Sequence, residues 1–345
     1  MNCCFNCFSD SHVKRLLCSV AQIGECDFCH SKDVYIANVD NDNEVVSRII
    51  ELLELYEISE DVRAKNIEDA LIDDWKVFNL SKKGIRKFIE TIYNSHRLKK
   101  NLLEKKAIIP ELYDEDFLSE HSITGGLSWE EFADYIKNVN RFHTNFNSSE
   151  FASYLSALAK TYEKGTVFYR GRIAKDSKGY KTDEMMAPPK ERRTAGRINP
   201  EGMLALYMSL DPKTILYEIR ANVYDYITIG KMVAKKKFRV VDLSKLENIS
   251  PFDYGGEIEN FAVNFNIFQD MAREISKPLR RNDSQLEYLP TQFITEFIKR
   301  EKYDGVAYRS TISDNGINIA LFDESLVECF DVNTVEVASI EYTTI

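Results

Sequence analysis

Apolar residues recur at the spacing of a helix from about residue 44 to residue 163, in a stripe that begins at Val45. Ser128 and Glu131 have the pattern of a capping box, which marks the start of a helix. The run 147–150 repeats this signal ahead of the next apolar stretch. We therefore expect about four to six helices in this part of the chain.

The pattern changes after Gly165, where short apolar runs alternate with turn residues. Strands are expected over 166–170, 203–210, 224–233, 238–243, 305–308, 317–322 and 335–342. Asp211-Pro212 predicts a short helix, because Asp caps a helix and Pro suits its first position. Pro290 opens another helix in the same way. The C-terminal half is therefore predicted to be α+β.

Six of the seven cysteines lie in the first 29 residues, and they include two CxxC pairs separated by 18 residues. The two pairs are Cys4, Cys7, Cys26 and Cys29. This spacing is typical of a four-thiolate zinc site, and such a site has no open position for a substrate. Cys3 could replace Cys4, and His12 and His30 are further substitute ligands. We expect a structural zinc, because so short a segment cannot build its own core.

The chain has 345 residues and a net charge of −10. Three segments are expected: a zinc-ribbon-like module over 1–40, a helical domain over 41–160 and an α+β domain over 161–345. The acidic balance argues against nucleic acid or an anionic membrane as the main partner. The first residues lack the pattern of a signal peptide, and no apolar run approaches the ~18 residues of a membrane span. A cytoplasmic protein with reduced thiols is expected.

Several common enzyme motifs are missing from the sequence, namely GxxxxGK[ST], GxGxxG, HExxH and GxSxG. The helical segment also lacks the Arg-x(4–6)-His pair of HEPN ribonucleases. Arg86 and His96 are too far apart for that motif, and Arg141 and His143 are too close. P-loop, Rossmann, zinc-protease and serine-hydrolase chemistry therefore lose support.

A basic loop over 187–197 ends in Gly196-Arg197. An arginine can grip a pyrophosphate through two parallel hydrogen bonds, so the loop suits an anion. Composition alone favours a solvated loop in which Arg197 holds backbone carbonyls. On the same basis Tyr207 would be a core residue, Glu218 a solvated residue at a helix end and Ser310 a turn cap.

Several pieces together resemble the RES family, which is named for its arginine, glutamate and serine. These pieces are Phe168-Tyr169-Arg170, Gly196-Arg197-Ile198-Asn199 with Gly202, Leu206-Tyr207, Glu218, Gln292 and the run 304–310. Their order and spacing cover about residues 160–330. Ile198 departs from the aromatic residue that many members carry there. The N-terminal half is similar to the zinc-ribbon and helical region of HEPN/RES-type proteins.

The resemblance implies an ADP-ribosyltransferase-like fold and an NAD-degrading toxin, typically one of a toxin–antitoxin pair. The nicotinamide–ribose bond would be cleaved by hydrolysis or by phosphorolysis. Implied partners are NAD and a cognate antitoxin or other inhibitor, and a homodimer of the helical domain is also considered. The alternatives are an ADP-ribosyltransferase that modifies a macromolecule and a non-enzymatic interaction protein with a degenerate domain.

The resemblance also implies roles for individual residues. Arg197 would bind the NAD phosphates, and Tyr207 would stack on or border the nicotinamide. Glu218 would hold ribose hydroxyls and stabilise the charge that develops as nicotinamide leaves, and Ser310 would fix the ribose or a nearby phosphate. Arg170, Tyr169 and Asn199 are the further predicted substrate-binding residues.

Overall fold

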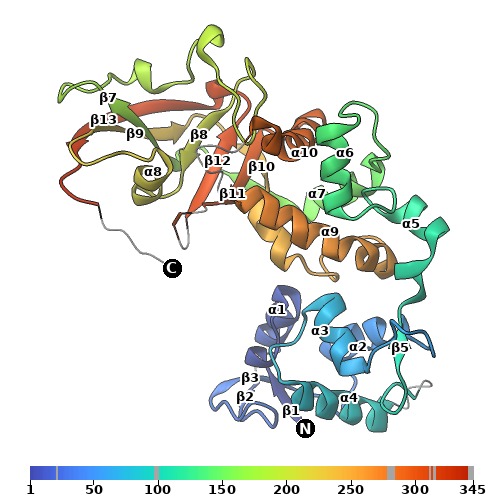
Figure 1. Cartoon of the computed structure of the whole chain (residues 1–345). Coiled ribbons are helices and arrows are strands. Elements are labelled where there is room, and N and C mark those ends of the chain that lie inside the picture. Colours follow the sequence, from blue (N-terminus) through green and yellow to red (C-terminus); the bar gives the residue numbers. More distant parts are fainter. Residues whose placement is uncertain (21, 97–100, 278–283, 311, 314–315, 341–345) are drawn as a thin grey trace. The chain divides into compact units, whose positions relative to one another are not determined.

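The chain forms two compact units in a computed structural model that describes residues 1–20, 22–96, 101–277, 284–310, 312–313 and 316–340 (Figure 1). Unit 1 is assembled from Met1–Leu127, Ser149–Ala157 and Asn248–Phe268, and unit 2 from Ser128–Ser148, Leu158–Glu247 and Gln269–Ile345. Each unit thus contains segments far apart in sequence, and the three predicted domain segments stay a prediction. Among the described helices, none is both long enough and apolar enough to cross a membrane.

Unit 1 begins with a small antiparallel sheet in the order β1-β3-β2, followed by helices. Its elements are β1 (Asn2–Cys4), α1 (Ser11–Ser19), β2 (Ile23–Gly24), β3 (Val34–Asn38), α2 (Glu44–Glu54), β4 (Glu57–Ile58), α3 (Ile67–Trp75), α4 (Lys82–His96), β5 (Ala107–Ile108), α5 (Glu115–His121), α7 (Ser148–Leu158) and the first part of α9 (Ile258–Ser276). Asn43 caps α2 by accepting a hydrogen bond from the amide of Val46. Phe8, Phe28 and Phe78 surround the ring of Phe88 and pack the cysteine-rich segment onto α4.

Unit 2 contains an eight-stranded sheet in the order β13-β9-β7-β8-β12-β11-β10-β6 (Figure 1). The strands are β6 (Ala159–Tyr162), β7 (Val167–Ala174), β8 (Leu206–Ser209), β9 (Tyr226–Ala234), β10 (Phe238–Asp242), β11 (Gly305–Arg309), β12 (Ile317–Leu321) and β13 (Val327–Glu336). Among the described strands of this sheet, β10 and β11 are the one parallel pair. The helices of this unit are α6 (Trp129–Asn138), α8 (Pro212–Glu218), α10 (Leu289–Arg300) and the end of α9. The predicted mixture of strands and helices is confirmed.

The two faces of this sheet differ in chemistry, because successive side chains of a strand point to opposite sides. One face carries the apolar core, which includes Phe168, Leu206, Met208, Ala307, Ile319 and Leu321. On the other face, direct pairing places Tyr308 next to Asn318, Asn318 next to Ser209, and Ser209 next to Tyr169. Tyr207 lies two positions before Ser209 and therefore shares this polar face. The strand alternation thus collects polar side chains from β7, β8, β12 and β11.

One sequence prediction about a strand is wrong, and one helix was not expected. The last strand is β13 over Val327–Glu336, so the strand predicted over 335–342 is wrong, and residues 341 and 342 lie outside the described residues. A bulge between Cys329 and Asp331 interrupts the alternation that a period-two pattern requires. The long helix α9 was not predicted at all, since it lies in a stretch that the sequence motifs left unassigned.

Candidate active site

The helix α8 places Glu218 over the polar face of the sheet. Asp211 caps α8 by accepting from the amide of Thr214 at 3.0 Å, and Pro212 occupies the first turn, as the sequence predicts. Gly171 of β7 lets the helix approach, because a Cβ there would collide with Ile215. The helix ends at Glu218, so the carboxylate projects from its last turn.

The carboxylate of Glu218 is held in a fixed orientation. Its Oε1 accepts hydrogen bonds from the hydroxyl of Ser310 at 2.6 Å and from the side-chain amide of Asn318 at 2.7 Å. Asn318 is buried within β12, whereas Glu218 is half-buried. Within the described part of the chain, Oε2 of Glu218 has no hydrogen-bond partner. The second oxygen therefore remains available to a ligand.

The turn after β11 fixes the direction of the Ser310 hydroxyl. Its Oγ accepts the backbone amides of Ile312 at 3.3 Å and Ser313 at 3.2 Å. With its lone pairs used in this way, the hydroxyl proton points to Glu218. The structure therefore brings Ser310 and Glu218 together, 92 residues apart in sequence.

Tyr207 joins the polar face to the basic loop. Its hydroxyl donates to Oδ1 of Asn199 at 2.7 Å and accepts the amide of Ile198 at 3.3 Å. Burial raises the pKa of Tyr207 to about 12, so the phenol stays protonated at physiological pH and can donate. Gly196 allows this contact, because a Cβ there would lie 2.6 Å from the Tyr207 hydroxyl.

Asn199 and Gln292 hold the basic loop in shape. The buried side-chain amide of Asn199 donates to the carbonyls of Thr194, Pro200 and Met203. Gln292 of α10 donates to the carbonyls of Gly196 at 2.7 Å and Asn199 at 3.1 Å. Both ends of the Asn199 side chain are thus bonded to the chain itself, so its predicted contact with substrate forms no part of the function proposed below.

Arg197 bonds to backbone carbonyls at the end of α9. Its Nη1 donates to the carbonyl of Ile275, and its Nη2 donates to that of Lys277 at 2.5 Å. The last carbonyls of a helix carry partial negative charge and attract a cation. Thr291 also donates to the backbone carbonyl of Arg197 at 2.8 Å. The guanidinium of Arg197 therefore binds backbone carbonyls, the arrangement expected from composition alone.

Tyr169 and Arg170 lie on opposite faces of β7. Tyr169 pairs with Ser209 and belongs to the polar face, whereas Arg170 shares the side of Phe168. Arg170 donates through Nη1 to the carbonyl of Tyr207 at 2.8 Å. Burial lowers its pKa to about 10, with Arg172 adding to the shift. Arg170 thus holds the backbone of β8 from the side of the apolar core. Its buried Nε has no partner among the described residues.

Tyr308 and Asn318 were not among the predicted site residues. Tyr308 is buried, and its burial raises its pKa well above the usual value. The charges of Tyr207 and Glu218 raise this pKa further, whereas the charge of Arg197 lowers it. This phenol therefore lies within electrostatic reach of all three predicted residues. A signal existed for both: Tyr308 falls in the quoted run 304–310, and Asn318 is a polar residue within an apolar strand.

The predicted metal ligands Cys4, Cys7, Cys26 and Cys29 come together in unit 1, with all four sulfur atoms within 4.8 Å of one another. The sulfur–sulfur distances are 3.8 Å for Cys4–Cys7, 3.4 Å for Cys4–Cys29 and 3.5 Å for Cys7–Cys26. A tetrahedron with Zn–S bonds of about 2.3 Å has edges of about 3.8 Å. The amide of Phe28 donates to Sγ of Cys26 at 3.4 Å, which suits a thiolate. The cluster includes Cys4 and not Cys3. Four sulfur atoms at these distances are a donor set that fits a metal.

The polar face with Glu218 lies within a region that matches a known family. The model of the RES domain matches residues 171–344. The chain belongs to the RES domain family. The match starts directly after Arg170 and includes the predicted residues Arg197, Tyr207, Glu218 and Ser310.

Curated proteins and solved structures add little to this assignment. No curated protein gives a significant match. Among solved structures, the chain is similar to one described as the crystal structure of the M. tuberculosis MbcT-MbcA toxin-antitoxin complex, with 13% sequence identity and a TM-score of 0.33. The likeness covers 53% of this chain and 91% of that one. The likeness of the N-terminal half to HEPN/RES-type regions stays a prediction.

Proposed function

We propose that this RES-domain protein cleaves NAD at the bond between nicotinamide and ribose. The observation that carries the proposal is the carboxylate of Glu218. Ser310 and Asn318 hold it through one oxygen, and the other has no hydrogen-bond partner among the residues that the structure describes. Loss of nicotinamide leaves an oxocarbenium-like ribose with positive charge, and a fixed carboxylate beside it stabilises that charge. Membership of the RES family supports NAD as the substrate.

The other residues have roles that follow from their positions. The ring of Tyr207 would border the nicotinamide, since it lies on the same face of the sheet as Asn318, which holds Glu218. The hydroxyl of Ser310 would orient Glu218 and border the ribose. Arg197 would bind the pyrophosphate, and its guanidinium would then exchange the carbonyls of Ile275 and Lys277 for phosphate oxygens. The family also supports a toxin that a cognate antitoxin or another inhibitor restrains.

The four-cysteine cluster is proposed to hold a structural zinc. Four thiolates complete a tetrahedron, so the metal would supply folding energy to the first 40 residues and no catalytic step. The chemistry proposed for Glu218 uses side chains of unit 2 alone.

Incubation of the purified full chain with NAD, with and without inorganic phosphate, tests the proposal. We expect free nicotinamide together with ADP-ribose if water is the acceptor, or with ADP-ribose-1-phosphate if phosphate is. Chromatography identifies the products. Absence of nicotinamide release by folded protein in both conditions would sink the proposal. Nicotinamide release with ADP-ribose attached to an added macromolecule would favour the transferase alternative.

Asn318 is expected to act as a positioning residue for Glu218. Replacing it by alanine removes one hydrogen bond to a charged oxygen, which is worth about 1.5–3 kcal/mol, so kcat should fall about 10- to 100-fold. KM should change little, because Asn318 bonds to Glu218 through Oε1 and not to the substrate. Asn333→Ala on β13 is the matched control. Equal kcat in Asn318→Ala and wild type would refute this role.

A further inference from the structure

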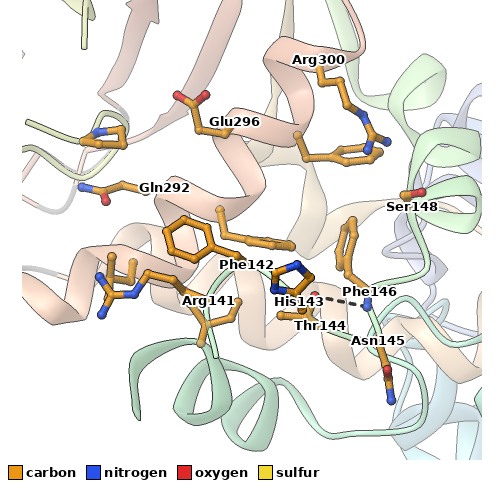
Figure 2. A pocket seen from close by; sticks show the side chains of 15 residues that line it. Arg141, Phe142, His143, Thr144, Asn145, Phe146, Ser148, Gln292, Glu296 and Arg300 are labelled. Atoms are coloured by element: carbon orange, nitrogen blue, oxygen red, sulfur yellow. Dashed lines mark hydrogen bonds between the residues drawn. The ribbon is translucent and has the colours of Figure 1, made fainter. Parts of the chain in front are cut away.

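A cavity of about 850 Å³ in unit 2 lies apart from the residues around Glu218. It is open to solvent and is lined by the end of α6, the loop 141–148, one side of α10, and Pro200 (Figure 2). Its volume falls within the range of about 300–1,000 Å³ that small-molecule sites occupy. None of Tyr207, Glu218 and Ser310 lines it. The cavity is therefore separate from the proposed NAD site.

Four phenylalanine rings line part of the cavity. They are Phe142, Phe146, Phe293 and Phe297. Phe146 packs edge-on against Phe293 and Phe297, with ring centroids 5.1 and 5.2 Å apart, so three of the rings form a fixed surface. Phe142 is 83% exposed, although its ring is one of the largest apolar groups of the loop. Such a surface matches a flat aromatic ring, which would stack on the fixed rings and cover Phe142.

Positive charge accompanies the rings. Figure 2 shows Arg141 and Arg300 on either side of Phe142, His143 and Phe146. Arg141 forms no ion pair or hydrogen bond through its side chain with any residue that the structure describes. Arg300 lies over the ring of Phe297 at 4.4 Å and bonds to Glu301. An arginine without an acidic partner beside exposed aromatic surface suits an anionic group attached to a ring.

The acidic group in the wall does not cancel this charge. Glu296 lies 4.0 Å from Lys299, one turn along α10, and that lysine offsets it. Glu301 pairs with Arg300 in the same way, so the net positive charge of the cavity comes from Arg141, within a chain of net charge −10. A ligand with an anion at one end and a planar ring at the other would satisfy both features.

We propose that this cavity binds a planar aromatic anion, that is, a ring system bearing a phosphate, sulfonate or carboxylate. Gln292 and Pro200 both line the cavity, and Gln292 donates to the carbonyls of Gly196 and Asn199. A bound ligand would therefore touch Gln292, which holds the loop carrying Arg197, and Pro200, which follows that loop in sequence. The proposal concerns binding and stands independently of the reaction at Glu218.

Fluorescence titration of the full chain with 8-anilinonaphthalene-1-sulfonate tests the proposal, because this probe is itself a planar aromatic anion. We expect saturable binding of one probe per chain. Phe142→Ser and Arg141→Gln should each weaken it about 5- to 10-fold. The matched controls Phe330→Ser, at a 70% exposed ring on β13, and Arg192→Gln should bind as wild type does. The neutral probe N-phenyl-1-naphthylamine should be insensitive to Arg141→Gln.

Three results would overturn the proposal: no saturable binding, equal affinity in wild type and Phe142→Ser, or equal loss in the control variants. Phe142→Ser is expected to fold, since the side chain is mostly exposed. Thr144→Trp places an indole ring in the cavity wall and, as a second check, should block binding of the probe. Self-association that Phe142→Ser abolishes, without probe binding, would assign the surface to a second copy of the chain. Because binding is read without NAD, failure of the NAD proposal would leave each of these outcomes interpretable.

Discussion

Replacement of Glu218 by glutamine is expected to lower the kcat for NAD cleavage by about 100- to 1,000-fold, the size found when a group that stabilises transition-state charge is removed. The glutamine oxygen can still accept from Ser310 and Asn318, so the geometry is kept while the negative charge is lost. The melting temperature should therefore stay close to that of wild type.

The measurement is the initial rate of nicotinamide release at saturating NAD, with Glu328→Gln on β13 as the matched control. The control should retain the wild-type rate, because Glu328 is exposed on a strand at the edge of the sheet. An unchanged rate in Glu218→Gln would remove this carboxylate from the mechanism.

Loss of the proposed zinc site is expected to have the largest effect on stability. Structural zinc contributes about 10–16 kcal/mol of apparent binding free energy in small zinc modules, in addition to the apolar packing of this segment onto α4. Cys26→Ser should therefore abolish zinc binding and unfold the β1-β3-β2 segment, which contains all four ligands.

Elemental analysis should find about one zinc per wild-type chain and close to none in Cys26→Ser. Limited proteolysis should then cut the variant within residues 1–40. Cys18→Ser is the matched control, because Cys18 is exposed and outside the cluster, and Cys3→Ser should also retain the metal. Full zinc occupancy in Cys26→Ser would contradict the four-thiolate site.

Local signals in the sequence predicted much of this structure. The cap at Asp211, the capping box at Ser128 and the strands around Tyr207 depend on neighbouring residues, and each is present. The cysteine spacing likewise predicted which four sulfur atoms meet, because each CxxC knuckle is a local turn.

Contacts between distant segments could not be predicted in the same way. Asn318 reaches Glu218 only because β12 pairs with β8 and α8 follows β8 directly, and no local pattern encodes this pairing. Arg197 bonds to the end of α9, a helix that lacks any recognised motif. Strand alternation predicts that Tyr169 and Arg170 point to opposite faces of the sheet. The sequence alone does not say which of the two faces the apolar core covers, and so which residue faces the site.

The most direct test of the account is a crystal structure of the Glu218→Gln variant bound to NAD. We expect the nicotinamide ribose beside residue 218, the nicotinamide against Tyr207, and the pyrophosphate on Arg197 in place of the carbonyls of Ile275 and Lys277. NAD bound away from the polar face of the sheet, with Arg197 still on those carbonyls, would contradict it.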